Sequence, residues 1–236
     1  MHAELLRERF FTAAISGQRA DARGMIHAAI EQQHSPEALL TELIWPTVQQ
    51  VQELHRADQI SLLAHNYATR LLRSVADQLQ PLLPQKQVDN RRLLVVSGAE
   101  QSEELAAQIV ADLLEARGSE VFYAGGGIEN DEIVAQVGEL KIQVLVVFGA
   151  VASTVPQTRL LIDRLHDIGI CPELQIVVGG GVFNRADGLA EEIGSDLWAK
   201  DPAEVVDVIC SQPEQRMMPS QRTVGRRRRG GSKNAA

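Results

Sequence analysis

The sequence has few cysteines, few aromatic residues and no long apolar run. Its two cysteines, Cys171 and Cys210, are far apart and form no CxxC pair, so we expect reduced thiols instead of a disulfide or a cysteine metal site. No apolar run approaches the ~20 residues of a membrane-spanning helix. The N-terminal "MHAELLRERF" has no apolar signal core. These absences predict a cytoplasmic protein that does not enter a membrane.

Basic residues are scarce in most of the chain. The net charge is −8, but seven Lys or Arg residues and no acid follow Glu214. Residues 1–215 therefore carry 16 basic against 31 acidic side chains. Such an acidic body argues against duplex binding, because neutralising phosphates needs clustered Lys and Arg. The tail 216–236 could contact nucleic acid or an acidic partner, or could be only a disordered, solubilising end.

The apolar pattern changes period once along the chain. Four segments with helical spacing predict an all-α four-helix cap bundle over 1–83. Prolines and the polar "QKQVDN" indicate a linker at 84–90. Strands in "RLLVVSG", "EVFYAGG", "QVLVVFGA", "LQIVVGGG" and "SDLWAK" alternate with helices over 91–213, and a basic tail occupies 214–236. Continuous Val, Leu and Ile runs are typical of a parallel sheet buried on both faces, so we predict a flavodoxin-like, doubly wound, five-stranded α/β domain.

A doubly wound sheet holds its ligand at the carboxyl ends of its strands, and three common binding devices are missing there. The turn "SGAEQSEEL" after the first strand has one glycine, too few for a dinucleotide fingerprint. Glu103 and Glu104 would repel a phosphate and are expected to stabilise the helix start instead. The third strand ends in "VVFGAVA", without the carboxylate of a phospho-receiver domain. No nucleophile–base pair accompanies the crevice, so we expect no enzyme.

Two glycine clusters are present instead, "AGGG" at 124–127 and "VVGGGVF" at 177–183. Glycine lets the backbone turn sharply or lets a ligand lie flat against it. Because Gly179–Gly181 follow a buried strand directly, they would leave a flat surface for a planar ligand. A plain strand-to-loop turn is the alternative interpretation for each cluster.

A helical bundle followed by a flavodoxin-like domain with this glycine segment resembles the cobalamin-binding modules. These occur in methionine synthase, in corrinoid proteins of methyltransferase systems and in light-sensing MerR-type repressors. The stretch 46–69 is similar to the family's cap segment and keeps Pro46, Leu54, Ile60, Ser61, Ala68 and Thr69. The segment after the fourth strand is similar to the family's "GG-x-x-F" at Gly179, Gly180, Gly181 and Phe183.

The departures from the family pattern fall on the residues that would hold the cofactor. The family's first turn reads D/E-x-H-x-x-G, and its His is the lower axial cobalt ligand; here the turn has Glu100, Ser102 and Leu105 in those places. A hydroxyl does not replace imidazole as a cobalt donor. In the cap, His55 takes the place of a Trp, and His65-Asn66 that of a Glu-His pair. The family's S-x-T/L element falls on Gly149-Ala150-Val151, with Ser153 nearby.

The resemblance leads to two hypotheses about function. In the first, the chain is a regulatory or sensor protein with a degenerate site, which acts on a protein partner and could self-associate. It would bind no cofactor or another tetrapyrrole, haem or a bilin, and His55 or His65 would ligate a metal only in haem; the alternative for both is a solvent-side helix histidine. In the second, the chain is a genuine cobalamin carrier that serves a methyltransferase. The candidate cofactor-binding residues are Gly98, Glu100, Ser102, Gly149, Val151, Ser153, Gly179, Gly180, Gly181, Phe183, His55, His65 and Asn66.

Overall fold

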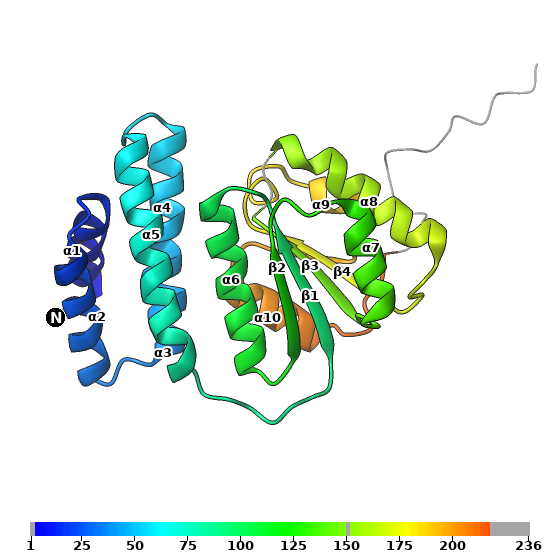
Figure 1. The fold of residues 1–236 in the computed structure, drawn as a ribbon, viewed down its shortest axis with the longest axis horizontal. Helices are drawn as coiled ribbons and strands as arrows, with labels where there is room; N and C mark the ends of the chain where they lie inside the picture. The colour runs from blue at the N-terminus through cyan, green and yellow to red at the C-terminus, as the bar shows by residue number, and fades with distance from the viewer. Residues whose placement is uncertain (1–2, 150–151, 218–236) are drawn as a thin grey trace, which may run out of the picture.

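The first third of the chain is helical, as the apolar spacing predicts (Figure 1). The computed structural model describes residues 3–149 and 152–217. The N-terminal elements are α1 (Ala3–Ile15), α2 (Arg19–Glu31), α3 (Pro36–Ala38), the π-helical segment η1 (Leu39–Ile44), α4 (Trp45–Arg56), α5 (Leu62–Leu79) and the 3-10 turn η2 (Gln80–Leu82). Because α3, η1 and α4 follow one another without a break, they act as one helix, and the cap is the expected four-helix bundle.

The π-helical segment in the third cap helix has a local cause in the sequence. The helix starts at Ser35, whose Oγ accepts a hydrogen bond from the Ala38 amide at 3.1 Å. Pro46 has no amide hydrogen, so the carbonyl of Glu42 loses its usual helical partner. The side chain of Arg7 on α1 donates to that carbonyl at 3.3 Å. The proline therefore loosens the helix and gives α1 a point of attachment.

The second part of the chain is a parallel sheet with helices on both faces. Its strands are β1 (Arg92–Ser97), β2 (Glu120–Gly125), β3 (Val144–Phe148), β4 (Gln175–Gly179) and β5 (Leu197–Ala199). They lie in the order β2-β1-β3-β4-β5, and all neighbouring pairs are parallel. The helices are α6 (Gln101–Ala116), α7 (Asn130–Glu139), α8 (Val155–Ile168), α9 (Leu189–Ile193) and α10 (Pro202–Ser211). The predicted fold class is confirmed.

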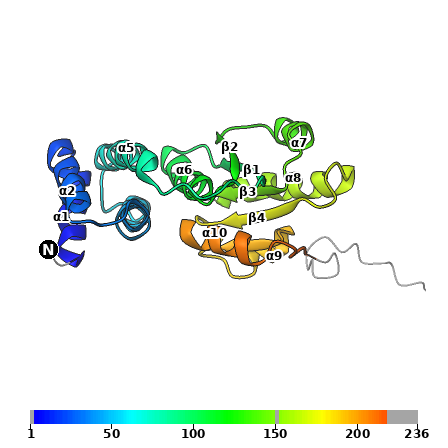
Figure 2. The ribbon, with the colours of Figure 1, turned by 90° about the horizontal axis from the view of Figure 1, so that it is seen from below.

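Side chains that alternate along the strands separate the two faces of the sheet. In β1, Leu93 and Val95 join one core cluster, whereas Leu94 and Val96 join the other. The first cluster contains the buried faces of α6, α10 and the cap; the second contains those of α7, α8 and α9. Figures 1 and 2 show the resulting layers, with the cap beyond α6 and the sheet between its two sets of helices.

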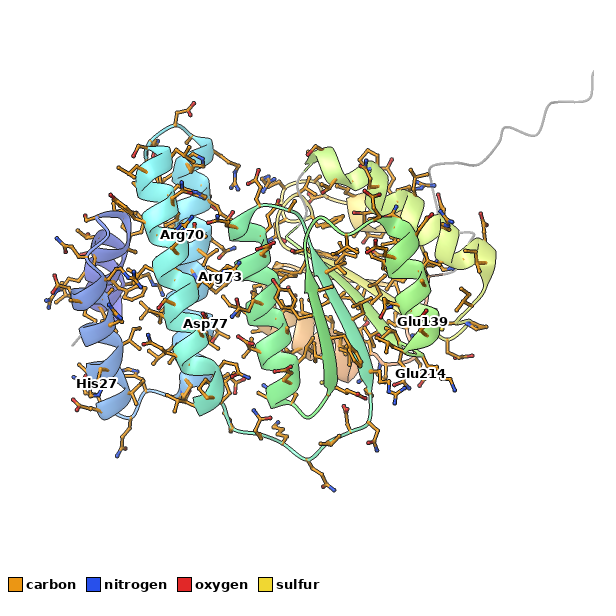
Figure 3. The ribbon with its side chains drawn as sticks, viewed as in Figure 1. His27, Arg70, Arg73, Asp77, Glu139 and Glu214 are labelled. Carbon is orange, nitrogen blue, oxygen red and sulfur yellow. The ribbon has the colours of Figure 1, made fainter. Side chains whose placement is uncertain are left out.

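The cap is attached to the sheet domain through α6. Figure 3 labels Arg73 and Asp77 along α5, the cap helix beside α6. Arg73 Nη2 donates to the carbonyl of Gln101 and to Glu104 Oε2, both at 3.2 Å, and Gln108 Nε2 donates to Asp77 Oδ1 at 2.7 Å. These contacts surround a core that is continuous between cap and sheet domain. The cap position is therefore set by packing and by polar contacts at the start and in the middle of α6.

Two expectations concern membranes and the chain ends. Within the described residues, no helix is both long and apolar enough to cross a membrane. The expectation for the tail at 216–236 lies, from residue 218 onward, outside the described residues.

Candidate functional site

A cavity of about 140 Å³ lies between the cap and the carboxyl edge of the sheet. Six of the predicted site residues line it: His55, His65, Glu100, Ser102, Gly149 and Gly181. Six further lining residues were not predicted: Trp45, Gln52, Arg56, Glu103, Ala106 and Arg185. The topology explains why these residues lie together, because β1, β3 and β4 all end at this edge and the cap helices α4 and α5 lie over it.

The acidic turn after β1 folds back on itself at the start of α6. Glu100 precedes the helix, and its amide donates to Glu103 Oε2 at 3.1 Å, which is half of a capping box. The Glu103 carboxylate then occupies the space where a side chain at Gly98 would lie. Ser102 is buried, and Leu105 is completely buried between sheet and cap. This turn is therefore closed by its own side chains, and its acids stabilise the helix as predicted.

Glu103 also takes part in the cavity wall. It is 3% exposed, and burial raises the pKa of its carboxyl to about 7, an effect that the Glu100 charge reinforces and the hydrogen bond from the Glu100 backbone opposes. Glu103 is one of the lining residues, and its Oε1 is buried without a hydrogen-bond partner in the described part of the chain. A residue of the cavity wall thus carries a carboxyl that gains or loses a proton near neutral pH.

The two cap histidines form a stacked pair over this edge. His55 lies in the last turn of α4 and His65 in the first turn of α5; their ring centroids are 4.3 Å apart, at an interplanar angle of 27°. Burial lowers the pKa of His65, and so does the neighbouring His55. Both Nδ1 atoms are buried and, among the described residues, unpartnered. The solvent-side alternative is wrong for His65, which is 9% exposed.

The glycine segment after β4 does not form an open flat surface along its whole length. A Cβ on Gly179 or Gly180 would come within 2.9 Å of the Phe148 ring, so both glycines lie against that ring. Gly181 reaches the cavity. Phe183 is buried in the core on the α7–α8 side of the sheet. The structure therefore explains Gly179 and Gly180 by close packing, and leaves Gly181 beside the cavity.

The remaining predicted residues lie elsewhere at the same edge. Gly98 lines a second cavity of about 620 Å³, which the start of α7 and the start of α8 enclose with three carboxylates, Glu129, Asp131 and Glu132. Ser153 is exposed in the 3-10 turn η3 (Ala152–Thr154), and Asn66 is half-buried beside His65. Val151 lies outside the described residues.

Comparison with known proteins identifies the family. Residues 91–207 match a model described as the B12 binding domain, and residues 6–80 match a second model of the same description. The chain belongs to the B12-binding family. The helical cap and the sheet domain are both covered by these two matches, as the sequence resemblance implied.

Individual relatives carry corrinoid names. Dimethylamine corrinoid protein 1 of Methanosarcina acetivorans is 23% identical over 132 residues, 55% of this chain and 61% of that protein, so the chain spans about three-fifths of this relative. Monomethylamine corrinoid protein 2 of the same organism is 22% identical over 85% of this chain and 94% of its own. The solved Methanosarcina barkeri monomethylamine corrinoid protein superposes with a TM-score of 0.75, at 20% identity over 88% of this chain and 98% of its own, which shows a common fold.

The side chains around the cavity include good donors to the cobalt of a corrinoid on the cap side, but not on the side of α6. On the side of α6, the turn from Glu100 to Leu105 offers a buried hydroxyl and carboxylates but no imidazole. On the cap side, His55 and His65 line the cavity, and the Nδ1 atom of each is buried without a hydrogen-bond partner among the described residues. Imidazole nitrogen is a good donor to cobalt and other transition metals, and a serine hydroxyl is a poor one. The donor set therefore fits such a metal through the cap.

Proposed function

We propose that the chain is a corrinoid carrier, which holds a cobalamin-type cofactor between its cap and the carboxyl edge of its sheet and presents it to a partner methyltransferase. The family, and relatives named for a corrinoid instead of a catalysed reaction, support this function over the sensor hypothesis. The relatives named above are corrinoid proteins, and none of their names refers to a sensor, a photoreceptor or a regulator of transcription. The expectation that the chain is not an enzyme agrees with those names.

The observation that carries the proposal is the convergence of three buried polar atoms on one cavity. His55, His65 and Glu103 all line this cavity, and His55 Nδ1, His65 Nδ1 and Glu103 Oε1 are buried with no hydrogen-bond partner in the described structure. A buried polar atom without a hydrogen bond costs about 1–3 kcal/mol, so several in one place are typical of a site that a ligand completes. No such convergence is needed to hold the cap, since Arg73 and Asp77 already bind it to α6.

A bound corrinoid would supply the metal centre that accepts and releases a methyl group; the chain would hold and orient it. Arg56 and Arg185 line the cavity and could pair with carboxylate or phosphate groups of a ligand. The present cavity is smaller than the ~300–1,000 Å³ of ordinary ligand sites. Loading therefore requires the cap to move away from the start of α6, and the ring-sized opening would lie over Gly149 and Gly181.

Reconstitution tests this function directly. Purified chain is mixed with hydroxocobalamin, adenosylcobalamin, haem or biliverdin and passed through gel filtration. The carrier function predicts a corrin absorption spectrum that elutes with the protein and is lost when the cavity is filled by Gly181→Trp, whereas Gly24→Trp on α2, away from the cavity, retains it. A protein that remains colourless with both cobalamins contradicts the proposal; retention of haem or biliverdin alone would favour the sensor hypothesis instead.

A partner and an oligomer remain predictions of the same proposal. If the chain presents a methyl group to another protein, a methyltransferase should co-elute with the cobalamin-loaded form more strongly than with the apoprotein. Light scattering on the same fractions would show whether the chain also associates with itself. Co-elution that is equal for loaded and apoprotein would contradict cofactor-dependent presentation.

A further inference from the structure

The turn before α6 presents no side chain that is a good donor to a bound metal. A side chain that binds the metal would therefore have to come from another part of the chain. Ser102 is 3% exposed, and the Glu103 carboxylate is turned back toward the Glu100 amide and Gly98. Neither Cys171 nor Cys210 is among the residues that line the cavity, and none of the lining residues contains sulfur. Imidazole in this wall comes from His55 and His65 alone, among the residues that the structure describes.

We infer that His65 supplies the protein's axial nitrogen to the metal of the bound tetrapyrrole, from the cap side, and that His55 is the positioning residue stacked against it. This inference rests on the proposed function. It assigns to α5 the donor role that the turn before α6 does not fill in this chain.

The surroundings of the two rings favour His65 as the donor. His65 is the more buried of the two, in the first turn of a helix whose start is fixed by the Ser61 side chain, which accepts from the Ala64 amide at 3.2 Å. His65 lines the cavity, and its Nδ1 is buried without a hydrogen-bond partner among the described residues. A ring held by a capped helix on one side and by a stacked ring on the other loses little rotamer entropy when it binds. His55 fixes the ring plane through this stack.

Groups on several elements act on the pKa of His65. A metal ligand must be neutral imidazole, and both burial and the neighbouring His55 lower the pKa of His65. Opposing groups also face the pair: Asn66 and Glu100 act on His65 in the other direction, and Glu103, Arg56 and Arg185 line the same cavity.

The number of available ligands indicates what kind of metal the pair could bind. In the described ranges, no group of three or more His, Cys, Asp or Glu side chains is placed to hold a metal ion. A free ion would need such a set. A metal already held by a macrocycle needs only one or two axial donors. One imidazole, with a second stacked on it, suits a chelated metal and not a free ion.

Electron paramagnetic resonance of the loaded protein tests the assignment. The chain is produced uniformly ¹⁵N-labelled and loaded with unlabelled cobalamin, which is then reduced to the cobalt(II) state. A protein nitrogen on the cobalt splits each cobalt line into a doublet, because the ¹⁵N nucleus has a spin of one-half. The cofactor's own base, which contains ¹⁴N, would give a triplet. We expect the doublet.

Three variants separate the roles of the residues. His65→Phe should remove the doublet and weaken retention of cobalamin by about tenfold or more, and imidazole added to His65→Gly should restore a nitrogen signal as a triplet. His55→Phe keeps an aromatic ring against His65 and should retain the doublet. His27→Phe is the matched control, because His27 lies exposed on α2 (Figure 3).

The outcomes distinguish this inference from the proposed function. A triplet, or no nitrogen splitting, in the labelled wild-type protein would overturn the inference while the carrier function stands. A doublet that His55→Phe removes and His65→Phe retains would overturn the assignment to His65. Failure of the wild-type chain to retain cobalamin would contradict the proposed function itself. If His65→Phe does not fold, the labelled wild-type spectrum still decides whether the donor is a protein nitrogen.

Discussion

Trp45 of the cap packs against Phe148 at the carboxyl end of β3, with ring centroids 5.7 Å apart and planes inclined at 57°. Tilted aromatic pairs of this kind stabilise a contact beyond the area that they bury. The Phe148 ring also lies against Gly179 and Gly180 after β4. One aromatic side chain therefore joins the cap, the third strand and the glycine segment, and its cap partner Trp45 lines the cavity between cap and sheet.

Gly179→Ala should destabilise the protein through this contact. The new Cβ would lie 2.5 Å from the carbonyl oxygen of Ala199 and 2.9 Å from the Phe148 ring. Overpacking of a buried site typically costs about 1–3 kcal/mol. Urea denaturation should show a lower free energy of unfolding for this variant than for the wild type.

The matched control for this substitution is Gly24→Ala on α2, where no atom lies within 4 Å of the new Cβ. Alanine inside a helix is about 0.5–1 kcal/mol more favourable than glycine, so Gly24→Ala should be neutral or stabilising. Equal stability of the two variants would contradict the close packing of Gly179 against Phe148.

Glu103→Gln should change how stability depends on pH. Burial raises the pKa of Glu103 to about 7 in the folded state, so between its ordinary value of 4.5 and about 7 the folded chain holds a proton that the unfolded chain releases. Stability is therefore expected to fall as pH rises through this window, by on the order of 2–3 kcal/mol, and to change little above it on this account. Glutamine does not titrate, so the free energy of unfolding of Glu103→Gln should lack this fall. The free energy of unfolding of the variant minus that of the wild type should therefore increase from pH 5 to pH 8.

Free energies of unfolding from urea titrations at several pH values measure this effect. Glu132→Gln, an exposed carboxylate on α7, is the control and should follow the wild type throughout. A constant offset between Glu103→Gln and the wild type from pH 5 to pH 8 would show that the Glu103 carboxyl is ionised over that whole range.

Arg73→Ala should loosen the attachment of the cap. The Arg73 guanidinium joins α5 to the Gln101 carbonyl and to Glu104, with about a third of each side chain exposed. Pairs this exposed contribute about 0.2–1 kcal/mol, so the loss of stability should be small. Since loading needs the cap to separate from α6, association with hydroxocobalamin should be about two- to fivefold faster. Stopped-flow absorbance measures the rate.

Arg70→Ala provides the comparison for Arg73, because Arg70 is exposed on the same helix and lies one turn away (Figure 3). It should leave the association rate unchanged. Equal rates for the wild type, Arg70→Ala and Arg73→Ala would contradict a barrier set by the contact between α5 and α6.

Leu105→Ala should be strongly destabilising, although the family resemblance places a glycine at this position. Leu105 is completely buried, in the core cluster that the cap, α6 and the sheet share. Truncating such a leucine typically costs about 2–5 kcal/mol. Leu62→Ala, at a position 62% exposed, should stay within about 0.5 kcal/mol of the wild type in the same thermal or urea measurement. A loss of less than 1 kcal/mol in the free energy of unfolding of Leu105→Ala would contradict the close packing of Leu105 in this core.

Several parts of the fold could be predicted because they depend on short-range patterns. The period of the apolar residues changes from helical spacing before Pro81 to buried runs after Arg91, and both kinds of element form where the pattern places them. The Ser35 cap was predictable for the same reason, since a serine followed by proline satisfies a helix start locally. The π-helical segment at Leu39–Ile44 was not predicted, although its cause, Pro46, is visible in the sequence.

The site was less predictable, because its members meet only after the chain has folded. His55 and His65 were candidates through their sequence positions, but their stacking depends on the crossing of α4 and α5. Glu103 was interpreted as a helix-stabilising acid, which is correct; its second role at the cavity follows from the approach of the cap. Arg185 lies two residues beyond Phe183, where no motif pointed to it.

The sequence by itself determined the order of helices and strands, the family, and the absence of an imidazole between Glu100 and Leu105. These depend on residue identity and on contacts between close neighbours in the chain. The tertiary structure decided that Gly179 and Gly180 pack on a ring, that the turn before α6 closes on itself, and that two histidines from the cap face the edge of the sheet. Each of these depends on which distant side chains share one space, and that is fixed only when the cap and the sheet are packed together.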